Sequence, residues 1–514
     1  MRGQHSVMSA AIRGVEAFLV EVEVAITSGI PGMFIVGMPD VAVQEARERV
    51  RASLKSSGFS MPNERVVVNL APSNLKKVGS GFDLPIAMGI LIASGQIDPR
   101  LAAGKLIVGE LGLDGNVRAV PGTLAFGMCA FDSGYALLCA DTSDAVPIEG
   151  LRQLGLASLL DLARASRATG GDPCELAYRG VPSFRIVDGG LSGSGSYPDY
   201  ADVCGHEVAK RALQIAAAGS HGVLMMGPPG SGKTMLASRV ASILPPLEHH
   251  EALEAAVVHS VTGEGVDEVL AGVRPFRSPH HSATLAGLVG GGNPIRPGEI
   301  SLAHQGVLFL DELAEFKPAV LQGIRQPMES GKVTLTRADG SIVFPARFML
   351  VAASNPCPCG YFGDESKPCT CSLTQIRQYQ GRIGGPLMDR IDIHLDIKRI
   401  PSDSFVAGQT GTSSAELREG VLAAREFASW RRARDGLDES GLGKPRSIIE
   451  SCRLAPDDKA FLEQMARVYD MSGRSIMRTL NVARTIADLS QKEAVDRSCV
   501  AEALGFRIRE GIGG

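Results

Sequence analysis

A glycine-rich segment near the middle of the chain has the residue types and spacing of a phosphate-binding loop. Residues 227–234 read GPPGSGKT; an apolar run precedes them and a helical pattern follows. Glycines let backbone N–H groups curl around phosphate oxygens, and the helix presents its positive N-terminal end to the same anion. We therefore predict ATP binding, with Lys233 reaching the β- and γ-phosphates and the Thr234 hydroxyl ligating Mg²⁺. The other predicted nucleotide contacts are Gly227, Pro228, Pro229, Gly230, Ser231 and Gly232.

Two further apolar runs each end in polar residues suited to a magnesium nucleotide. Residues 306–313 read GVLFLDEL, so an apolar strand would deliver Asp311 and Glu312 to its C-terminal end, where α/β sheets bind ligands. We expect Asp311 to hold the Mg²⁺ shell and Glu312 to orient and polarise the attacking water. The run at 348–353 ends near Asn355, which would hydrogen-bond the γ-phosphate or the water. The alternative for Asp311 and Glu312, and also for Asn355, is a solvated turn, because turns favour Asp and Asn.

A cluster of cysteines lies just after Asn355. Cys357, Cys359, Cys369 and Cys371 form the pattern C-P-C-x9-C-T-C. Four thiolates so close together suit a tetrahedral Zn²⁺, and a site with all four positions filled would be structural and not catalytic. The alternative is four free thiols in a glycine-rich loop.

Length and composition place limits on the class of protein. The chain has 514 residues, of which 44% are hydrophobic and 21% are charged, so about three globular domains are expected. The formal net charge of −4 excludes a histone-like polycation but leaves room for a local basic groove. Aromatic residues make up 5%, which favours contacts with a nucleic-acid backbone over base stacking.

Membrane and secreted classes are disfavoured by the same sequence. No run reaches the roughly 18 apolar residues of a membrane span, and the N-terminus has no apolar core of signal-peptide length. Ten cysteines in a chain of this length do not indicate a disulfide scaffold. We therefore expect a cytoplasmic protein with no membrane partner.

Pattern and composition divide the chain into four parts. Residues 1–175 mix β-branched runs with helical patterns at 43–58 and 82–94, which indicates an α+β domain. A Gly/Ser-rich linker follows at 176–199. Residues 200–401 alternate helices with strands at 222–226, 306–310 and 347–353, which predicts an α/β core with a parallel sheet covered on both faces. Residues 402–514 have a helical pattern throughout.

The order of these motifs resembles the AAA+ P-loop ATPase superfamily, and in particular magnesium-chelatase ATPase subunits and minichromosome-maintenance helicases. The resemblance implies a ring in which each subunit lends an arginine to its neighbour's nucleotide. In LMDRIDIH at 387–394, Arg390 is the best candidate for this arginine, and Arg325 is second. Arg390 could instead form a surface ion pair with Asp389 or Asp392.

A second arginine is expected from the helical C-terminal segment. The resemblance implies that Arg474, at the start of a predicted helix, lies where the lid meets the nucleotide, with Arg478 one turn later able to share this role. A solvated helix face is the alternative for both residues.

Two insertions of the α/β core resemble those of the same branch. One is the loop-rich segment 276–303, in which we reject a metal site at the adjacent His280 and His281. The other is 332–346, where alternating β-branched residues flank a turn and predict a hairpin bearing Lys332 and Arg337. In a ring, both would face the central pore and grip a phosphate backbone; a hairpin with merely solvated charges is the alternative.

The N-terminal domain resembles the Lon protease fold, on the strength of LAPSNLKKVGSGFDLPIAMG at 70–89. A Lon-type site needs a nucleophilic serine in its turn and a lysine to deprotonate it. Here Gly81 falls at the expected serine position and Ser80 is out of step, so we predict a non-proteolytic domain for substrate binding or ring assembly. Lys76, Lys77 and the basic residues at 47–51 are weaker candidates for DNA contact.

Nearly the whole chain is similar to the ComM/YifB family of magnesium-chelatase-like proteins. This resemblance implies a homohexameric ATP hydrolase, with Lys233, Glu312, Asn355, Arg390 and Arg474 as catalytic residues. It further implies a helicase or branch-migration motor on single-stranded or branched DNA, working with the recombinase machinery in natural transformation. Two other functions stay open, a chelatase-like ATPase that remodels a protein partner and an ATP-dependent protease-like remodeller.

Overall fold

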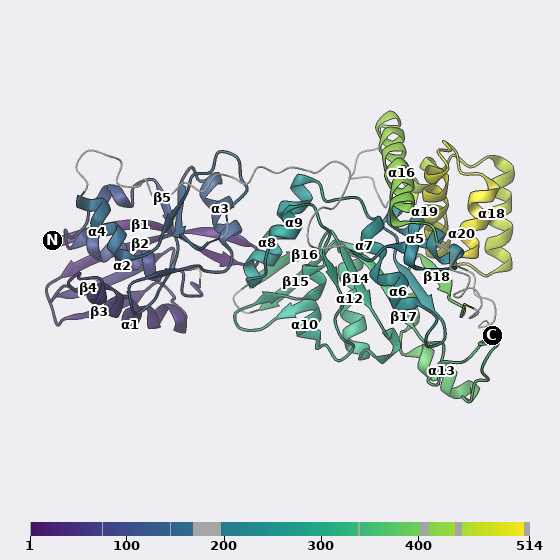
Figure 1. Cartoon of the computed structure of the whole chain (residues 1–514), viewed down its shortest axis with the longest axis horizontal. Helices are drawn as coiled ribbons and strands as arrows, with labels where there is room; N and C mark the ends of the chain where they lie inside the picture. Colours follow the sequence, from purple (N-terminus) through teal and green to yellow (C-terminus); the bar gives the residue numbers. More distant parts are fainter. Residues whose placement is uncertain are drawn as a thin grey trace.

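The structure is a computed structural model that describes residues 2–74, 76–143, 145–167, 197–337, 340–400, 411–436 and 445–507. Figure 1 shows the N-terminal domain, the α/β core and the helical C-terminal part following one another along the long axis. Of the predicted linker at 176–199, only residues 197–199 lie within the described part.

The N-terminal domain is built on a seven-stranded sheet in the order β3-β4-β2-β1-β5-β8-β9. Its longest strands form an antiparallel hairpin, and in β2 every second residue is buried, as a half-covered sheet requires. The two predicted helices are confirmed as α1 (Val41–Ser56) and α2 (Asp83–Ala93), and α2 is buried almost completely because nearly all of its residues are apolar. The strands are β1 (Arg2–Arg13), β2 (Glu16–Thr27), β3 (Gly32–Val36), β4 (Arg65–Ala71), β5 (Lys105–Ile107), β8 (Ala136–Ala140) and β9 (Gln153–Leu156).

The α/β core contains a five-stranded sheet in the order β11-β14-β17-β10-β18, with every neighbouring pair parallel. The three central strands are the predicted ones, namely β10 (Val223–Met226), β14 (Val307–Leu310) and β17 (Met349–Ser354). All of their residues are buried, as expected for strands covered by helices on both faces. The edge strands β11 (Phe276–Arg277) and β18 (Ile393–Asp396) were not predicted, because they are short and adjoin polar segments.

Helices cover this sheet. The helix predicted at 234–243 divides at Arg239 into α6 (Lys233–Ser238) and α7 (Val240–Ile243). The insertion at 276–303, expected to be loop-rich, contributes an edge strand, two short helices and a small two-stranded sheet (β12–β13). The other long helices are α5 (Glu207–Gly219), α8 (His249–Thr262), α12 (Pro318–Ser330) and α13 (Leu373–Gly381).

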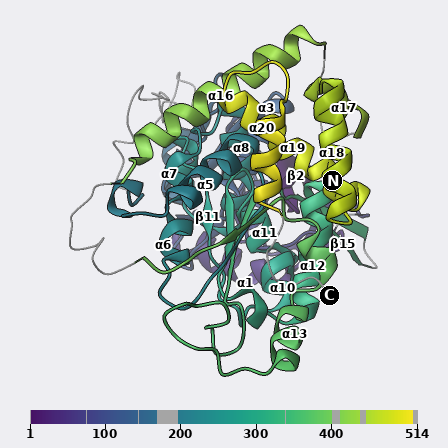
Figure 2. The same ribbon diagram turned by 90° about the vertical axis from the view of Figure 1, so that its right-hand side faces the viewer.

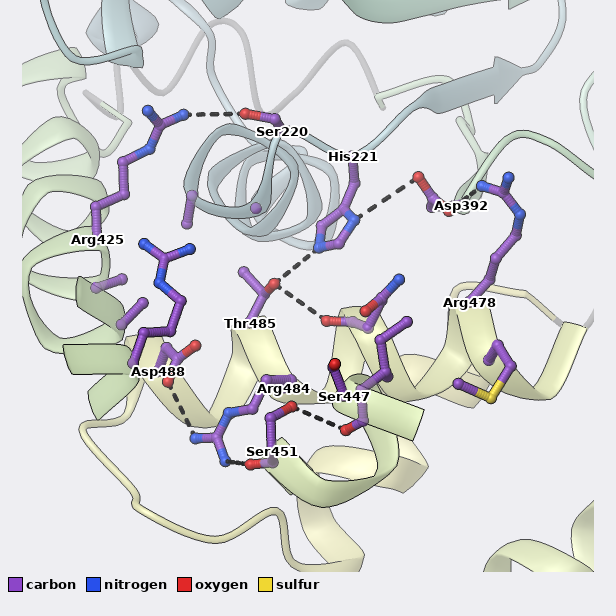
Figure 3. A pocket seen from close by; sticks show the side chains of 18 of the residues that line it. Ser220, His221, Asp392, Arg425, Ser447, Ser451, Arg478, Arg484, Thr485 and Asp488 are labelled. Atoms are coloured by element: carbon purple, nitrogen blue, oxygen red, sulfur yellow. Dashed lines mark hydrogen bonds and ion pairs between the residues drawn. The ribbon is translucent and has the colours of Figure 1, made fainter. Parts of the chain in front are cut away.

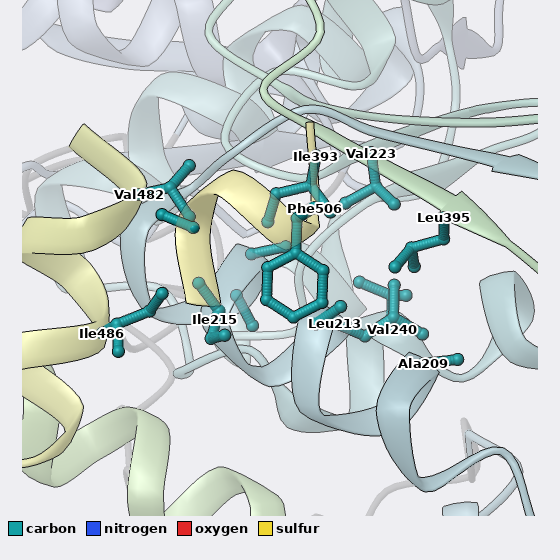
Figure 4. Packing of buried hydrophobic residues seen from close by; sticks show 14 of the residues in the cluster. Ala209, Leu213, Ile215, Val223, Val240, Ile393, Leu395, Val482, Ile486 and Phe506 are labelled. Atoms are coloured by element: carbon teal, nitrogen blue, oxygen red, sulfur yellow. The ribbon is translucent and has the colours of Figure 1, made fainter. Parts of the chain in front are cut away.

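The C-terminal part is helical, as predicted, and shares one hydrophobic core with the sheet. In Figure 4 the ring of Phe506 lies among side chains of α5, α7, β18 and α19, including Leu213, Val240 and Ile393. Figure 2 looks onto this part, with α16 running across the core helices. Because the buried surface is continuous, the helical part is fixed on the core. Its helices are α16 (Ser414–Arg434), α17 (Pro445–Cys452), α18 (Pro456–Val468), α19 (Gly473–Leu489) and α20 (Arg497–Gly505).

The N-terminal domain packs on the core through a second mixed cluster. Apolar residues of α3 (Thr123–Asp132) and α8 share this cluster, and the backbone N–H of Gly122 donates to the carbonyl of Ser260 at 2.8 Å. The turn of the β1–β2 hairpin reaches the predicted hairpin of the core, where a Cβ on Gly14 would lie 2.8 Å from Cγ2 of Ile342. This hairpin is confirmed as β15 (Lys332–Arg337) and β16 (Gly340–Pro345).

Candidate functional site

The glycine-rich loop lies between β10 and α6, at the C-terminal end of the sheet. Gly230 and Gly232 have φ of +76° and +86°, a left-handed backbone that glycine adopts without strain. Lys233 begins α6 and is 8% exposed. Its Nζ donates to the carbonyls of Gly227 at 2.7 Å and Pro228 at 3.0 Å and lies 3.3 Å from Oδ1 of Asn355. Burial lowers the pKa of this ammonium, and the charge of Asp311 opposes the shift.

The predicted magnesium ligands meet at the same edge. The hydroxyl of Thr234 donates to Oδ2 of Asp311 at 2.7 Å, so the first turn of α6 touches the end of β14. Hydroxyl and carboxylate oxygens are hard ligands of the kind that Mg²⁺ prefers, and the pair therefore fits the predicted metal position. Lys233, Thr234, Asp311 and Asn355 are brought together by three different strands.

Glu312 follows Asp311 in a left-handed conformation with φ of +51°. Its backbone N–H donates to Oδ1 of Asp311 at 2.9 Å, while its carboxylate lies 3.0 Å from Nδ1 of His281. No role was predicted for His281 beyond the rejection of a metal site there. The contact with Glu312 could not be predicted, because no local pattern links the two residues. His281 belongs to the segment 276–303, so in this conformation the insertion holds the side chain of Glu312.

The four cysteines also converge. Cys357 is buried, and its Sγ lies 3.4 Å from Cys359 Sγ and 3.7 Å from Cys369 Sγ. All four ligand atoms, including that of Cys371, lie within 4.8 Å of one another. A tetrahedral zinc with Zn–S bonds of about 2.3 Å holds its sulfurs about 3.8 Å apart, so the cluster fits this ion.

Backbone groups prepare this cluster for a cation. N–H groups of Tyr361 and Thr370 lower the pKa of Cys359 to about 5. At Cys369 the N–H of Cys371 acts in the same direction, but burial and the neighbouring thiols outweigh it and raise the pKa to about 12. The neighbouring thiols thus favour a thiolate at Cys359 and oppose one at Cys369, and a bound dication would favour ionisation of both.

The cysteine loop lies directly on the phosphate loop. A Cβ on Gly360 would come within 2.6 Å of Cδ of Pro229, and Nη2 of Arg399 donates to the Pro229 carbonyl at 2.9 Å. Arg399 also lies 3.5 Å from Asp364 inside the cysteine loop. A metal ion or contact that rigidifies the cysteine loop would therefore also hold the phosphate loop in place at Pro229.

Arg390 lies at the N-terminal ends of the parallel strands, opposite the phosphate loop. β10 and β18 pair in parallel from Val223↔Ile393 to Met226↔Asp396. Arg390 precedes β18 and the phosphate loop follows β10, so four strand residues, or about 10 Å, separate the two ends. Arg390 forms an ion pair with Glu329 at 2.9 Å, in place of the surface pairs with Asp389 or Asp392.

Arg474, predicted to lie where the lid meets the nucleotide, lies with Arg390 in this structure. Its Nη2 donates to the same Glu329 at 3.1 Å. The first residues of α19, Gly473 and Arg474, line a cavity with Ser220 and His221, which precede β10, so α19 begins at the end of the sheet away from the phosphate loop. Arg478 donates to the carbonyl of Arg390 at 2.6 Å and to Asp392. Arg325 belongs to this group too, because a Cβ on Gly384, ahead of Arg390, would lie 3.2 Å from its Nη2.

The DNA candidates have different surroundings. Lys332 and Arg337 are exposed on the β15–β16 hairpin, as contact with a backbone requires. Lys76 is exposed, whereas Lys77 is completely buried and its ammonium donates to the carbonyl of Pro72. Lys77 is therefore excluded as a DNA contact.

The N-terminal domain shows no serine–lysine pair at the predicted turn. The hydroxyl of Ser80 donates to Glu110, while the ammonium of Lys77 donates to Pro72. Each of the two groups a protease would need to couple therefore has another partner. Gly81, at the expected nucleophile position, has no side chain.

Comparisons with known proteins agree with this architecture. Residues 199–405 match the family described as magnesium chelatase, subunit ChlI; residues 22–142 match subunit ChlI of Mg-chelatase; and 411–507 match the ChlI C-terminal family. The chain is 41% identical over 505 residues to the competence protein ComM of Haemophilus influenzae, covering 98% of this chain and 97% of that protein. It is 40% identical over 519 residues to YifB of Escherichia coli K12, covering 98% and 96%. A magnesium-chelatase 67 kDa subunit of Chlorobaculum parvum is 33% identical over 159 residues, or 30% of this chain and 23% of that one.

The contact between the cysteine loop and the phosphate loop makes a prediction. Replacing Gly360 by Ala should weaken ATP binding about ten-fold or more, about 1.4 kcal/mol, because the new Cβ displaces the Pro229 ring. Gly363→Ala is the matched control, since Gly363 has a similar φ of +79° but its Cβ would meet nothing within 4 Å. Titration with a fluorescent ATP analogue measures both. Equal affinities in the two variants would contradict the coupling.

Proposed function

The chain belongs to the ComM/YifB family of magnesium-chelatase-like AAA+ proteins. From this premise we propose that it is a ring-forming ATP hydrolase that acts as a DNA motor. One observation supports ATP hydrolysis above all: four predicted site residues meet at the C-terminal ends of the parallel strands. They are Lys233, Thr234, Asp311 and Asn355. Backbone N–H groups of the loop at 227–232 would surround the phosphates of ATP. Thr234 and Asp311 would hold Mg²⁺, and Asn355 would contact the γ-phosphate.

We assign the role of general base to Glu312. Its position next to Asp311 is suitable for orienting water, but its carboxylate is held by His281 in the present conformation. Hydrolysis therefore requires the insertion at 276–303 to release this side chain. If that insertion also faces the DNA, contact with DNA and release of the base are linked in one segment.

The position of Arg390 supports a ring. An arginine at the edge of the sheet away from the phosphate loop cannot reach its own nucleotide, but it can meet that of the next subunit in a closed assembly. Because Arg474 shares Glu329 with Arg390, we propose that both act on the neighbour. Two cations delivered together would stabilise charge on the transferring phosphoryl group. A homohexamer is the proposed assembly.

The DNA partner rests on two observations. A relative that matches over 98% of this chain is a competence protein, and Lys332 and Arg337 are exposed on a hairpin. We propose helicase or branch-migration activity on single-stranded or branched DNA, beside the recombinase machinery of natural transformation in the cytoplasm. Among the described residues, no helix is long and apolar enough to cross a bilayer.

Two observations weigh against the other functions. The chelatase subunit of Chlorobaculum parvum aligns with 30% of this chain, whereas the competence relative aligns with nearly all of it. A protease-like remodeller would need a nucleophile, and Ser80 and Lys77 have separate partners.

For the cysteine cluster we propose a structural zinc held by Cys357, Cys359, Cys369 and Cys371. The spacing of the sulfurs supports it. The ion would brace the loop that lies against Pro229, so its role would be to fix the wall of the phosphate loop.

DNA stimulation tests the proposed function directly. We expect ATP turnover to rise on adding forked or single-stranded DNA at low salt, and to fall about 10²–10⁴-fold in Glu312→Gln, which loses the base but keeps ATP binding. Lys233→Ala should abolish ATP binding at the phosphate loop. Absence of both DNA binding and DNA stimulation at low salt would overturn the DNA motor, while intact turnover in Glu312→Gln would remove its role as base.

Mixing subunits tests the arginine. Arg390→Ala should lower turnover about 10³-fold with ATP affinity unchanged, because an arginine finger contributes that order of magnitude. Mixed with Glu312→Gln protein, it should regain part of the activity, since a pocket that combines the intact Glu312 of one variant with the intact Arg390 of the other is then formed. If no mixing ratio restores turnover, action across subunits is refuted.

Metal analysis tests the zinc. We expect one zinc ion for each chain of the purified protein, and loss of this ion in a Cys357→Ser, Cys369→Ser double variant. Cys204→Ser serves as the control, because Cys204 lies outside the cluster. Protein purified without chelators that contains no zinc would contradict the assignment.

A further inference from the structure

A large cavity lies between the α/β core and the helical C-terminal part, away from the phosphate loop. Its volume is about 1140 Å³, which is enough for a nucleotide-sized ligand. The end of α5, residues Ser220 and His221, and Glu329 form the wall on the core side, while α16, α17 and α19 form the other (Figure 3). The cavity is strongly basic, because the arginines that line it are Arg425, Arg431, Arg432, Arg474, Arg478 and Arg484, against the carboxylates Glu248, Glu329, Asp392 and Asp488.

Each buried carboxylate of the cavity already has an arginine partner. Asp488 accepts from Nε and Nη2 of Arg431, both at 3.1 Å, and pairs with Arg484 at 3.1 Å. Two guanidinium groups around one carboxylate leave a net positive charge at this wall, and Nη1 of Arg431 is buried with no hydrogen bond.

An excess of positive charge also occurs at the cavity wall formed by the α/β core. Asp392 accepts from Arg478 and lies 3.7 Å from Nδ1 of His221. Burial opposes its ionisation, but these two neighbours outweigh burial and lower its pKa to about 2. Glu329 pairs with both Arg390 and Arg474. The fourth carboxylate, Glu248, is exposed and lies 3.5 Å from His250.

Two arginines of the cavity therefore form no ion pair with a carboxylate of the described residues. Arg425 donates only to the carbonyl of Ala217 at 2.8 Å and the hydroxyl of Ser220 at 3.2 Å, and its Nε is buried with no hydrogen bond. Burial, with the charges of Arg274 and Arg432, lowers its pKa to about 10. Arg432 makes no hydrogen bond or ion pair with the described residues. They are seven residues apart on α16, so they lie on the same face.

Unpaired cations that face one cavity are costly unless an anion completes them. We propose that this cavity is a second phosphate site, which binds the phosphate chain of a nucleotide through Arg425 and Arg432. Guanidinium groups suit this ligand because each can donate two parallel hydrogen bonds to a phosphate. The cavity is separate from the phosphate loop, since Ser220, His221 and Asp392 adjoin the opposite ends of β10 and β18.

Occupation would have a structural effect. The walls come from both the core and the helical part, so a polyanion between them would add contacts that hold α16 and α19 against the end of α5. The ligand would thereby strengthen the attachment of the helical part, which also carries Arg474. The phosphate chain could come from a free nucleotide or from the nucleotide held by a neighbouring subunit.

The test uses the full-length chain and tripolyphosphate or ATP as the probe. In a Lys233→Ala background, calorimetry should still detect binding of tripolyphosphate, and adding Arg432→Glu should weaken it about ten-fold or more. Because Arg432 forms no hydrogen bond or ion pair with the described residues, the change removes none of these, and the variant should fold normally. Arg418→Glu is the matched control, because it is on α16 but outside the cavity lining.

The outcomes separate the two sources. Binding in the Lys233→Ala background that depends on Arg432 identifies a free nucleotide. No binding in that background, together with an ATP affinity of the otherwise unchanged protein that falls on Arg432→Glu and not on Arg418→Glu, identifies the nucleotide of a neighbour. If Arg432→Glu and Arg418→Glu behave alike in both experiments, the second phosphate site is refuted.

Discussion

The common direction of the strands in the central sheet is the constraint on which the rest of this protein depends. Because β10, β14 and β17 are parallel, the loops that follow them open at one edge, where Lys233, Asp311 and Asn355 meet. The same polarity places the residues that precede β18, with Arg390 among them, at the opposite, N-terminal ends of the strands. One subunit thus carries the phosphate-binding half of a site and, at its far side, the arginines that would complete another.

Shared carboxylates organise the arginine-rich edge. Glu329 holds Arg390 and Arg474, and Asp488 holds Arg431 and Arg484. Such pairs fix side chains in position without neutralising them fully, so the surface retains positive charge for an anion from outside. The Asp488 pairs join α16 to α19 within the helical part, whereas the Glu329–Arg474 pair joins the helical part to the core. The shared apolar cluster around Phe506 sets the distance between the two parts.

Contacts between segments connect the chemistry to the rest of the chain. His281 brings the insertion at 276–303 to Glu312, Gly360 brings the cysteine loop to Pro229, and Gly14 brings the N-terminal domain to the β15–β16 hairpin. Each contact joins a separate segment to the α/β core. The phosphate site is therefore in contact with the insertion at 276–303 and with the cysteine loop, as well as with its own loop.

The sequence alone determined the parts of this protein that depend on local order. A glycine loop between a strand and a helix, carboxylates at the end of an apolar run, and a hairpin alternation are patterns of neighbouring residues, so GPPGSGKT, Asp311 and 332–346 could be predicted. The spacing of the four cysteines likewise indicated a metal cluster. The tertiary structure decided which distant groups meet. It placed Arg474 beside Arg390, gave Glu312 to His281, buried Lys77, and left Arg425 and Arg432 facing a cavity. These results follow from how helices pack over a sheet, which brings together residues more than 200 positions apart that no local pattern relates.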